Sequence, residues 1–114
     1  LVVEDDEDLS IIFGEALELA NCKTEVIQDG QKALEWLALN VPRLVILDLH
    51  LPNLGGASIL SYIRRQPHLA HASVIVTTAD ARLGESLRSQ AELVLIKPVS
   101  FIQLRNLAKR LLSR

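Results

Sequence analysis

Short apolar runs are spaced along the chain and predict the strands of a sheet. Four strong runs, of three or four residues each and rich in leucine or β-branched residues, lie at 1–3, 44–47, 74–76 and 93–96. A weaker alternating run lies at 24–28. Because a run that is apolar at every position is buried on both faces, the strong runs predict strands of a parallel sheet covered by helices.

Helical patterns lie between these runs. After the first run, apolar residues recur at three- and four-residue spacing and predict an amphipathic helix. They are Leu9, Ile12, Phe13, Ala16, Leu17 and Ala20. Three shorter apolar stripes follow. Ala33, Leu34 and Leu37 come after the turn Asp29-Gly30, and Leu60 and Ile63 come after the pair Gly55-Gly56. Leu83 and Leu87 come after the fourth run.

The last helical pattern begins at Ser100, where Gln103 stands three residues on, as in a capping box. Strand and helix thus alternate five times. This alternation predicts an α/β fold, a doubly wound sheet of five parallel strands with helices on both faces. The apolar side of the last helix consists of Leu104, Leu107, Ala108 and Leu111.

Length and composition narrow the class of protein. The 114 residues are 49% hydrophobic and 23% charged, which fits one compact domain over 1–114 and excludes a disordered tail. No apolar run approaches the roughly 18 residues that a membrane span needs. The single cysteine, Cys22, excludes a disulfide framework and a cysteine-based zinc cluster, and is expected to be a small hydrophobe or an inert surface thiol. Because the chain opens inside an apolar run and contains no Met, we expect a domain cut from a longer protein.

Acidic and basic residues are unevenly placed, although the net charge is only −2. Residues 1–29 hold nine acids and one base, whereas residues 61–114 hold nine bases and three acids. The near-neutral balance argues against direct nucleic-acid binding. The basic second half is either a set of solvated helix faces or one side of a docking surface.

Polar residues interrupt the pattern where the predicted strands end. Because the carboxyl ends of parallel strands share one edge of the sheet, where open α/β sheets bind ligands, these residues are expected to converge. They are Glu4 and Asp5 after the first run, Asp48 after the third, Thr77 and Thr78 after the fourth, and Lys97 after the fifth.

The converging carboxylates, hydroxyl and ammonium suit phosphoryl chemistry. Carboxylates at close range repel one another unless a cation lies among them, and oxygen ligands without His or Cys select a hard cation such as Mg²⁺. An Asp beside Mg²⁺ can attack phosphorus and form an aspartyl phosphate, whose oxygens Lys97 and Thr78 would bind. Taken singly, each residue has a plainer explanation: Asp6 or Asp8 as a helix cap, Lys97 as a surface charge, Thr78 as a loop residue.

Four segments resemble those of response-regulator receiver domains. They are LVVEDD at 1–6, DLHLPNLGG at 48–56, VIVTTA at 74–79 and IKP at 96–98, and the turn Asp29-Gly30 followed by Ala33-Leu34 is also similar. The resemblance covers essentially the whole chain. It implies a flavodoxin-like fold with the strand order 2-1-3-4-5, which is known for a member of this family.

The resemblance also implies roles for individual residues. Asp48 would be the phosphoacceptor, with Thr78 and Lys97 binding the phosphoryl group. Mg²⁺ would be held by Asp48, by Asp5 directly, by Glu4 through water and by the backbone carbonyl of His50. Thr78 would shift on phosphorylation. The loop beneath the acceptor would be shaped by Pro52 and Gly56, and the Lys97–Pro98 bond would be cis.

The sequence departs from the family pattern at a few positions. Val94 stands at a switch position that usually holds Tyr or Phe, so the response is expected to depend on Thr78 and on backbone movement. Gln90 replaces a frequent glycine. His50 and Asp80 lie two residues after Asp48 and Thr78, where the family tunes the phosphoryl lifetime, and we expect a lifetime unlike that of fast-cycling members.

The implied function is a phosphorelay switch and not an enzyme that turns over a separate substrate. A histidine kinase or phosphotransfer protein would supply the phosphoryl group in the cytoplasm, away from any membrane. An output domain, another partner or a second copy of the chain would dock on the face formed by the fourth helix, fifth strand and fifth helix. The basic residues expected on that face are Arg82, Arg88, Arg105, Lys109 and Arg110.

Other functions remain open at this point. A pseudo-receiver would bind partners without phosphorylation, which Val94 favours and the intact site opposes. A phosphatase resembling haloacid dehalogenases needs a second Asp at the position of His50. A flavin binder would need donors where these strands end in acids. We expect His68 and His71 to be solvated loop residues and Trp36 to be a packing residue.

Overall fold

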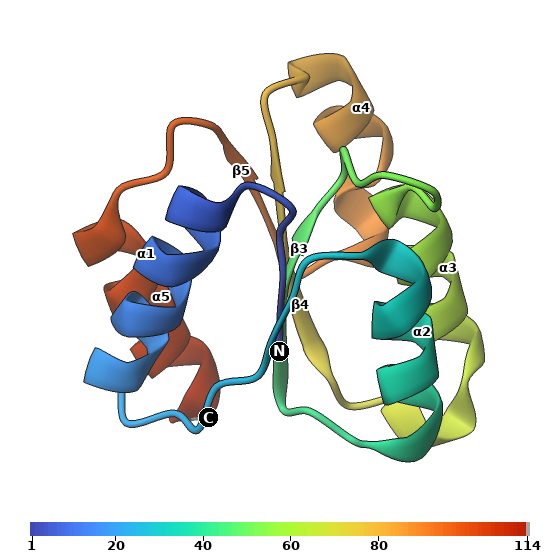
Figure 1. Cartoon of the computed structure of the whole chain (residues 1–114), viewed down its shortest axis with the longest axis horizontal. Coiled ribbons are helices and arrows are strands. Elements are labelled where there is room, and N and C mark those ends of the chain that lie inside the picture. Colours follow the sequence, from blue (N-terminus) through green and yellow to red (C-terminus); the bar gives the residue numbers. More distant parts are fainter. Residues whose placement is uncertain (114) are drawn as a thin grey trace.

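The computed structural model describes residues 1–113 as five strands and five helices in strict alternation, with two short 3₁₀ turns (Figure 1). The strands are β1 (Val2–Val3), β2 (Val26–Ile27), β3 (Leu44–Asp48), β4 (Ser73–Thr78) and β5 (Leu93–Ile96). The helices are α1 (Glu7–Leu19), α2 (Gly30–Leu39), α3 (Gly56–Arg65), α4 (Ala81–Ser86) and α5 (Phe101–Leu112), and the 3₁₀ turns are Pro67–Leu69 and Arg88–Gln90.

All five strands are parallel and lie in the order β2-β1-β3-β4-β5, which confirms the predicted topology. The chain therefore winds outward from β1 in one direction and returns to build the other half of the sheet. The order reverses between β1 and β3, so the loops that follow these two strands diverge and leave space at the carboxyl edge.

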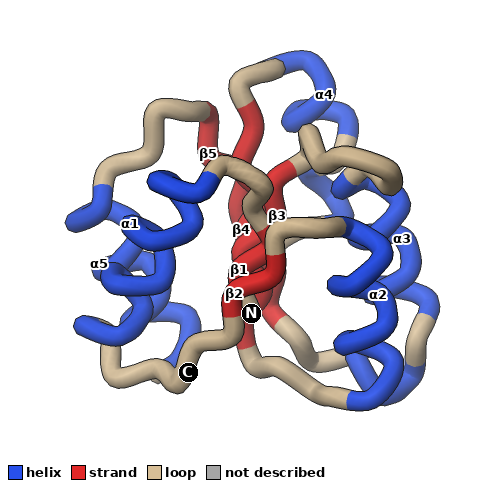
Figure 2. The backbone as a smooth tube through the Cα atoms, viewed as in Figure 1, coloured by secondary structure: helices blue, strands red, loops and turns tan. Residues whose placement is uncertain are grey.

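Helices cover both faces of the sheet (Figure 2): α1 and α5 lie on one side, and α2, α3 and α4 on the other. Alternate residues of β3 divide between two cores. Ile46 packs with Phe13 and Leu104 on the α1/α5 side, whereas Leu47 packs with Leu37 and Ile63 on the α2/α3 side. Because each face of the strand is covered, every residue of β3 is buried, as its continuous apolar pattern predicts.

Polar side chains start the helices at the expected places. Asp6 caps α1 by accepting the Leu9 N–H at 3.0 Å, and Ser100 caps α5 by accepting the Gln103 N–H at 3.1 Å. Capping of this kind satisfies backbone donors that have no partner within the helix. In the part of the chain that the structure describes, no helix has the length and apolar character to cross a bilayer.

Three expectations were wrong in detail. β5 is not buried on both faces: it is an edge strand whose residues are partly or fully exposed, because only β4 flanks it and α4 is a short helix. Ile12 is 38% exposed, since α1 turns Phe13, Ala16 and Leu17 toward the core instead. Leu87 lies beyond the end of α4, which closes at Ser86.

Candidate functional site

Three carboxylates meet at the carboxyl edge of the sheet. Glu4 and Asp5 follow β1, and Asp48 is the last residue of β3, which pairs with β1 so that Val3 lies beside Leu47. One oxygen of each carboxylate lies within 4.8 Å of the other two. Glu4 and Asp48 are buried and Asp5 is exposed. The predicted acidic group is therefore assembled, with one side open to solvent.

Lys97 brings a positive charge to the two buried acids. It follows β5, whose last residue lies beside Thr78, and the Lys97 N–H donates to the Thr78 carbonyl at 2.8 Å. Its Nζ lies 2.9 Å from Glu4 Oε1 and 3.4 Å from Asp48 Oδ1. The Lys97–Pro98 bond is cis, as the sequence resemblance implies. The ammonium thus contacts both buried acids of the group.

Thr78 closes the site on the β4 side. Its Oγ1 accepts the Asp80 N–H at 2.9 Å and lies 3.2 Å from His50 Nε2. The His50 N–H donates in turn to Asp48 Oδ1 at 3.3 Å. His50 therefore contacts both Asp48, through its backbone, and Thr78, through its ring. The Thr78 hydroxyl thus contacts His50 and Asp80, and His50 links it to Asp48.

The loop between β3 and α3 is held close against the end of β3. The Gly56 N–H donates to the Leu49 carbonyl at 3.1 Å, and a Cβ on Gly56 would lie only 2.7 Å from Leu49 Cα and closer still to the Asp48 carbonyl oxygen. Pro52 is exposed at the outer part of the loop. A side chain at residue 56 would thus displace the backbone that carries Asp48.

The acids carry more negative charge than one ammonium offsets. Burial raises the pKa of Glu4 from 4.5 to about 7, although hydrogen bonds from Lys97 and from the Asp6 N–H lower it. Burial lowers the pKa of Lys97, but its bond to Glu4 and the charges of Glu4 and Asp48 outweigh this and raise the pKa overall. Oxygen ligands in this number, two buried and one exposed, fit a hard divalent cation such as Mg²⁺.

The raised pKa of Glu4 predicts a pH dependence of stability in metal-free protein. A raised folded-state pKa means that the contribution of Glu4 is fully present below pH 4.5 and is lost as the pH rises through about 7. We expect the free energy of unfolding to fall by about 2 kcal/mol from this group between pH 5 and pH 8, measured by urea denaturation in chelator. In Glu4→Gln this fall should disappear, and in wild type Mg²⁺ should reverse it. A wild-type profile identical to that of the variant would contradict the assignment.

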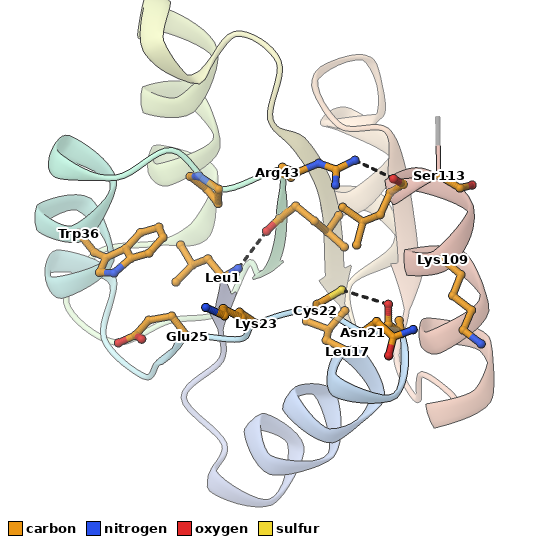
Figure 3. Close-up of a pocket in the computed structure, with 14 residues that line it drawn as sticks. Leu1, Leu17, Asn21, Cys22, Lys23, Glu25, Trp36, Arg43, Lys109 and Ser113 are labelled. Atoms are coloured by element: carbon orange, nitrogen blue, oxygen red, sulfur yellow. Dashed lines mark hydrogen bonds between the residues drawn. The ribbon is translucent and has the colours of Figure 1, made fainter.

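A second concavity lies at the opposite, amino edge of the sheet (Figure 3). Leu1, Leu17, Cys22, Trp36 and other residues from the ends of β1, α1, α2 and α5 line it. Burial raises the pKa of the half-buried Cys22 thiol, whose Sγ lies 3.7 Å from the Ala20 carbonyl, and Trp36 packs partly buried against the core. Trp36 therefore has the packing role expected of it, and Cys22, which packs partly buried against the core, fits the first of its two expected roles, a small hydrophobe. The acidic group is on the other edge, so this concavity is not part of the candidate site.

Sequence reasoning missed one contact that holds the β3–α3 loop. Asn53 has a positive φ of 69° and donates from Nδ2 to Asp29 Oδ1 at 2.9 Å, while Asp29 also caps α2. These bonds hold the pKa of Asp29 below its usual range, the Lys32 N–H having the larger effect. Asn at a turn is a detectable signal for a positive φ, but its partner comes from a distant loop.

An ion-pair cluster at the other end of β4 was also missed. Arg64 at the end of α3 pairs with Glu92 at 2.9 Å and donates to the Gln90 carbonyl at 2.6 Å, and Glu92 accepts the Val74 N–H. The backbone of Gln90 is thus tied to α3. No pattern in the sequence joins residues so far apart.

Neither of the two remaining histidines belongs to the site. His68 and His71 are both exposed, as expected, and lie in or after the 3₁₀ turn Pro67–Leu69. His68 Nε2 is also 2.8 Å from the Leu37 carbonyl, so this ring contacts the end of α2.

Comparisons with known proteins agree with the geometry. A family model described as "Response regulator receiver domain" matches residues 1–109. A curated relative from Methanothrix harundinacea, named "Probable methanogenesis regulatory protein FilR2", is 34% identical over 92% of this chain and 75% of its own length. The sensor histidine kinase TmoS of Ectopseudomonas mendocina is 32% identical over 99% of this chain but only 12% of its own length. The crystal structure of the signal receiver domain of a signal transduction histidine kinase from Syntrophus aciditrophicus is 31% identical, with a TM-score of 0.86, over 98% of this chain and 87% of that one.

Proposed function

This chain belongs to the response regulator receiver domain family, and within that family we propose that Asp48 accepts a phosphoryl group with Mg²⁺ and that the domain then changes its surface. The family match confirms the resemblance seen in the sequence. What supports the proposal is the convergence of the Asp48 carboxylate with Glu4, Asp5 and Lys97 at one sheet edge.

The proposed reaction is a direct transfer. An oxygen of Asp48 attacks phosphorus, an O–P bond forms, and the bond from phosphorus to the leaving group breaks, with the leaving group taking the electron pair. The leaving group is an imidazole nitrogen of a phosphohistidine or the acetate of acetyl phosphate. Lys97, already 3.4 Å from Asp48 Oδ1, would bind the negative oxygens, and the Thr78 hydroxyl would turn to them.

The metal ligands would be the carboxylates of Asp5 and Asp48, Glu4 through water, and the backbone carbonyl of His50. Bound Mg²⁺ would offset the negative charge of the transferred oxygens and of the acids. The proposal is tested by the mass gained on phosphorylation, and a pseudo-receiver, which gains none, is its principal alternative. A haloacid-dehalogenase-like phosphatase is disfavoured because residue 50 presents an imidazole that faces Thr78 instead of a second carboxylate.

We expect His50 to lengthen the life of the aspartyl phosphate. Its ring reaches across from the Asp48 loop to Thr78, a position from which it would limit the approach of water to the acceptor. Loss of phosphate from His50→Asn, followed by intact mass after removal of the donor, should be several-fold faster than from wild type. His71→Asn, which changes an exposed histidine, is the matched control. Equal lifetimes in His50→Asn and wild type would show that His50 has no such role.

The partners are proposed on the same basis. A histidine kinase or phosphotransfer protein would donate the phosphoryl group in the cytoplasm. An output domain, another partner or a second copy would use the face of α4, β5 and α5. Of the basic residues expected there, Arg82 and Arg110 are exposed, Arg105 is half-buried and Arg88 pairs with Glu85 at 2.8 Å. Lys109 instead lines the concavity at the amino edge, together with Leu17 and Cys22.

A further inference from the structure

Thr78 has two different neighbours on its two side-chain branches. The hydroxyl Oγ1 faces the acidic site through His50 and also accepts the N–H of Asp80, whose carboxylate caps α4. The methyl Cγ2 points instead to Gly84, the buried residue within α4. Thr78 itself is fully buried. One side chain therefore joins the acidic site to the helix beside it.

Gly84 allows α4 to lie unusually close to the ends of β4 and β5. A Cβ at this position would lie 2.8 Å from Val94 Cγ1, 3.1 Å from Thr78 Cγ2 and 3.6 Å from Ile96 Cδ1. The first distance is shorter than carbon atoms tolerate without movement, and the second requires the neighbour to shift. The side chains that would be met are two short β-branched residues with little rotamer freedom. Because Gly84 has no side chain, α4 can pack directly against Thr78 and Val94, and we call this packing contact the seat of α4.

We propose that Gly84 is a positioning residue, which couples the orientation of Thr78 to the position of α4. The inference rests on the proposed function, in which the hydroxyl turns toward a phosphoryl group on Asp48. Because Oγ1 and Cγ2 are bonded to the same Cβ, a rotation that redirects the hydroxyl also moves the methyl from its place against Gly84. The same rotation breaks the bond from the Asp80 N–H at the start of α4.

The coupling needs no aromatic side chain. Val94 is half-buried in β5 and contributes its Cγ1 to the seat, so the packing of α4 depends on methyl groups from two adjacent strands. A well-packed contact of this kind has few intermediate arrangements, because small shifts create either overlap or a void. Phosphorylation would therefore move α4 between two positions, a population shift at the proposed docking face.

Amide hydrogen exchange in α4 and at Leu87, the residue that follows it, tests this packing. The amides to follow are those of Gly84, bonded to the Asp80 carbonyl at 3.0 Å, and Leu87, bonded to the Gly84 carbonyl at 3.2 Å. We compare wild type, Gly84→Ala, Val94→Ala and the double variant, each with Mg²⁺ and with or without beryllofluoride as the phosphoryl mimic. Bound beryllofluoride is measured separately by ¹⁹F NMR.

This packing contact predicts that Gly84→Ala changes amide exchange in the direction opposite to that expected from helix propensity. Alanine is a better helix former than glycine, so if the close packing around Gly84 had no effect, Gly84→Ala would slow amide exchange in α4. With the seat, the overlap should make these amides exchange about fivefold faster or more in the free protein, and should abolish the change caused by beryllofluoride. Val94→Ala removes the 2.8 Å overlap, so the double variant should regain most of the protection and of the response.

The outcomes separate this inference from the proposed function. Wild type that binds no beryllofluoride would overturn the proposed function, and the coupling with it. If wild type binds beryllofluoride, slower or unchanged exchange in Gly84→Ala, or a double variant no better than Gly84→Ala, would overturn the role of Gly84 alone.

Discussion

Replacing Gly56 by alanine should destabilise the domain by at least about 3 kcal/mol, measured as the free energy of unfolding in urea. The added Cβ would lie 2.7 Å from Leu49 Cα and would overlap the Asp48 carbonyl oxygen. These are backbone atoms at the end of a central strand, so they cannot rotate aside as the end of a side chain can. Relief requires α3 to move away from β3 and to break the bond from the Gly56 N–H to the Leu49 carbonyl.

Gly55→Ala is the matched control for this substitution. It makes the same chemical change one residue earlier, where the nearest atom to the new Cβ is the Leu49 carbonyl oxygen at an ordinary 3.9 Å. We expect the control to change the stability by less than about 1 kcal/mol. Similar stabilities of the two variants would mean that the close approach of α3 to β3 does not limit the fold.

Lys97→Gln should slow the uptake of phosphate from acetyl phosphate by about 100- to 1000-fold, the usual effect of removing one preorganised donor to a developing charge. The Lys97 ammonium contacts both buried acids, at 2.9 Å and 3.4 Å. Without it, the attacking Asp48 and the incoming phosphoryl oxygens lose the one ammonium of the site. The rate is followed by intact mass at saturating Mg²⁺.

Two further measurements identify the cause of this loss. Lys23→Gln removes an exposed lysine and should react at the wild-type rate. In Lys97→Gln the pKa of Glu4, already raised to about 7, should rise further, because the hydrogen bond that lowers it is gone. An uptake rate within about threefold of wild type would contradict the role of Lys97 in transition-state charge stabilisation.

The pattern of residues was sufficient to predict a parallel α/β sheet and the meeting of the acids, whereas the strand order came from the resemblance to receiver domains. The continuous apolar runs of β3 and β4 could only be strands covered on both faces, and the alternation with helices made them parallel. Once the strands were parallel, the residues just after them had to share an edge. The positions of Glu4, Asp48 and Lys97 followed from that geometry alone.

The contacts between side chains of distant elements could not be predicted in this way. The approach of Gly84 to Thr78 and Val94, the ring of His50 on Thr78 and the bond from Asn53 to Asp29 depend on how far each helix or loop lies from the sheet. Periodicity states which face of an element is buried but not the distance to its neighbour. The exposure of β5 was missed because its continuous apolar run was taken to mean burial on both faces, although the implied strand order places this strand at an edge.

Whether Asp48 is a metal-dependent phosphoacceptor can be measured as a change in the intact mass of the protein. Wild type and Asp48→Asn are each incubated with acetyl phosphate, with Mg²⁺ or with chelator. We expect the added mass of one phosphoryl group in wild type with Mg²⁺ and none in the other three samples. No added mass in wild type, or an equal addition in Asp48→Asn, would contradict it.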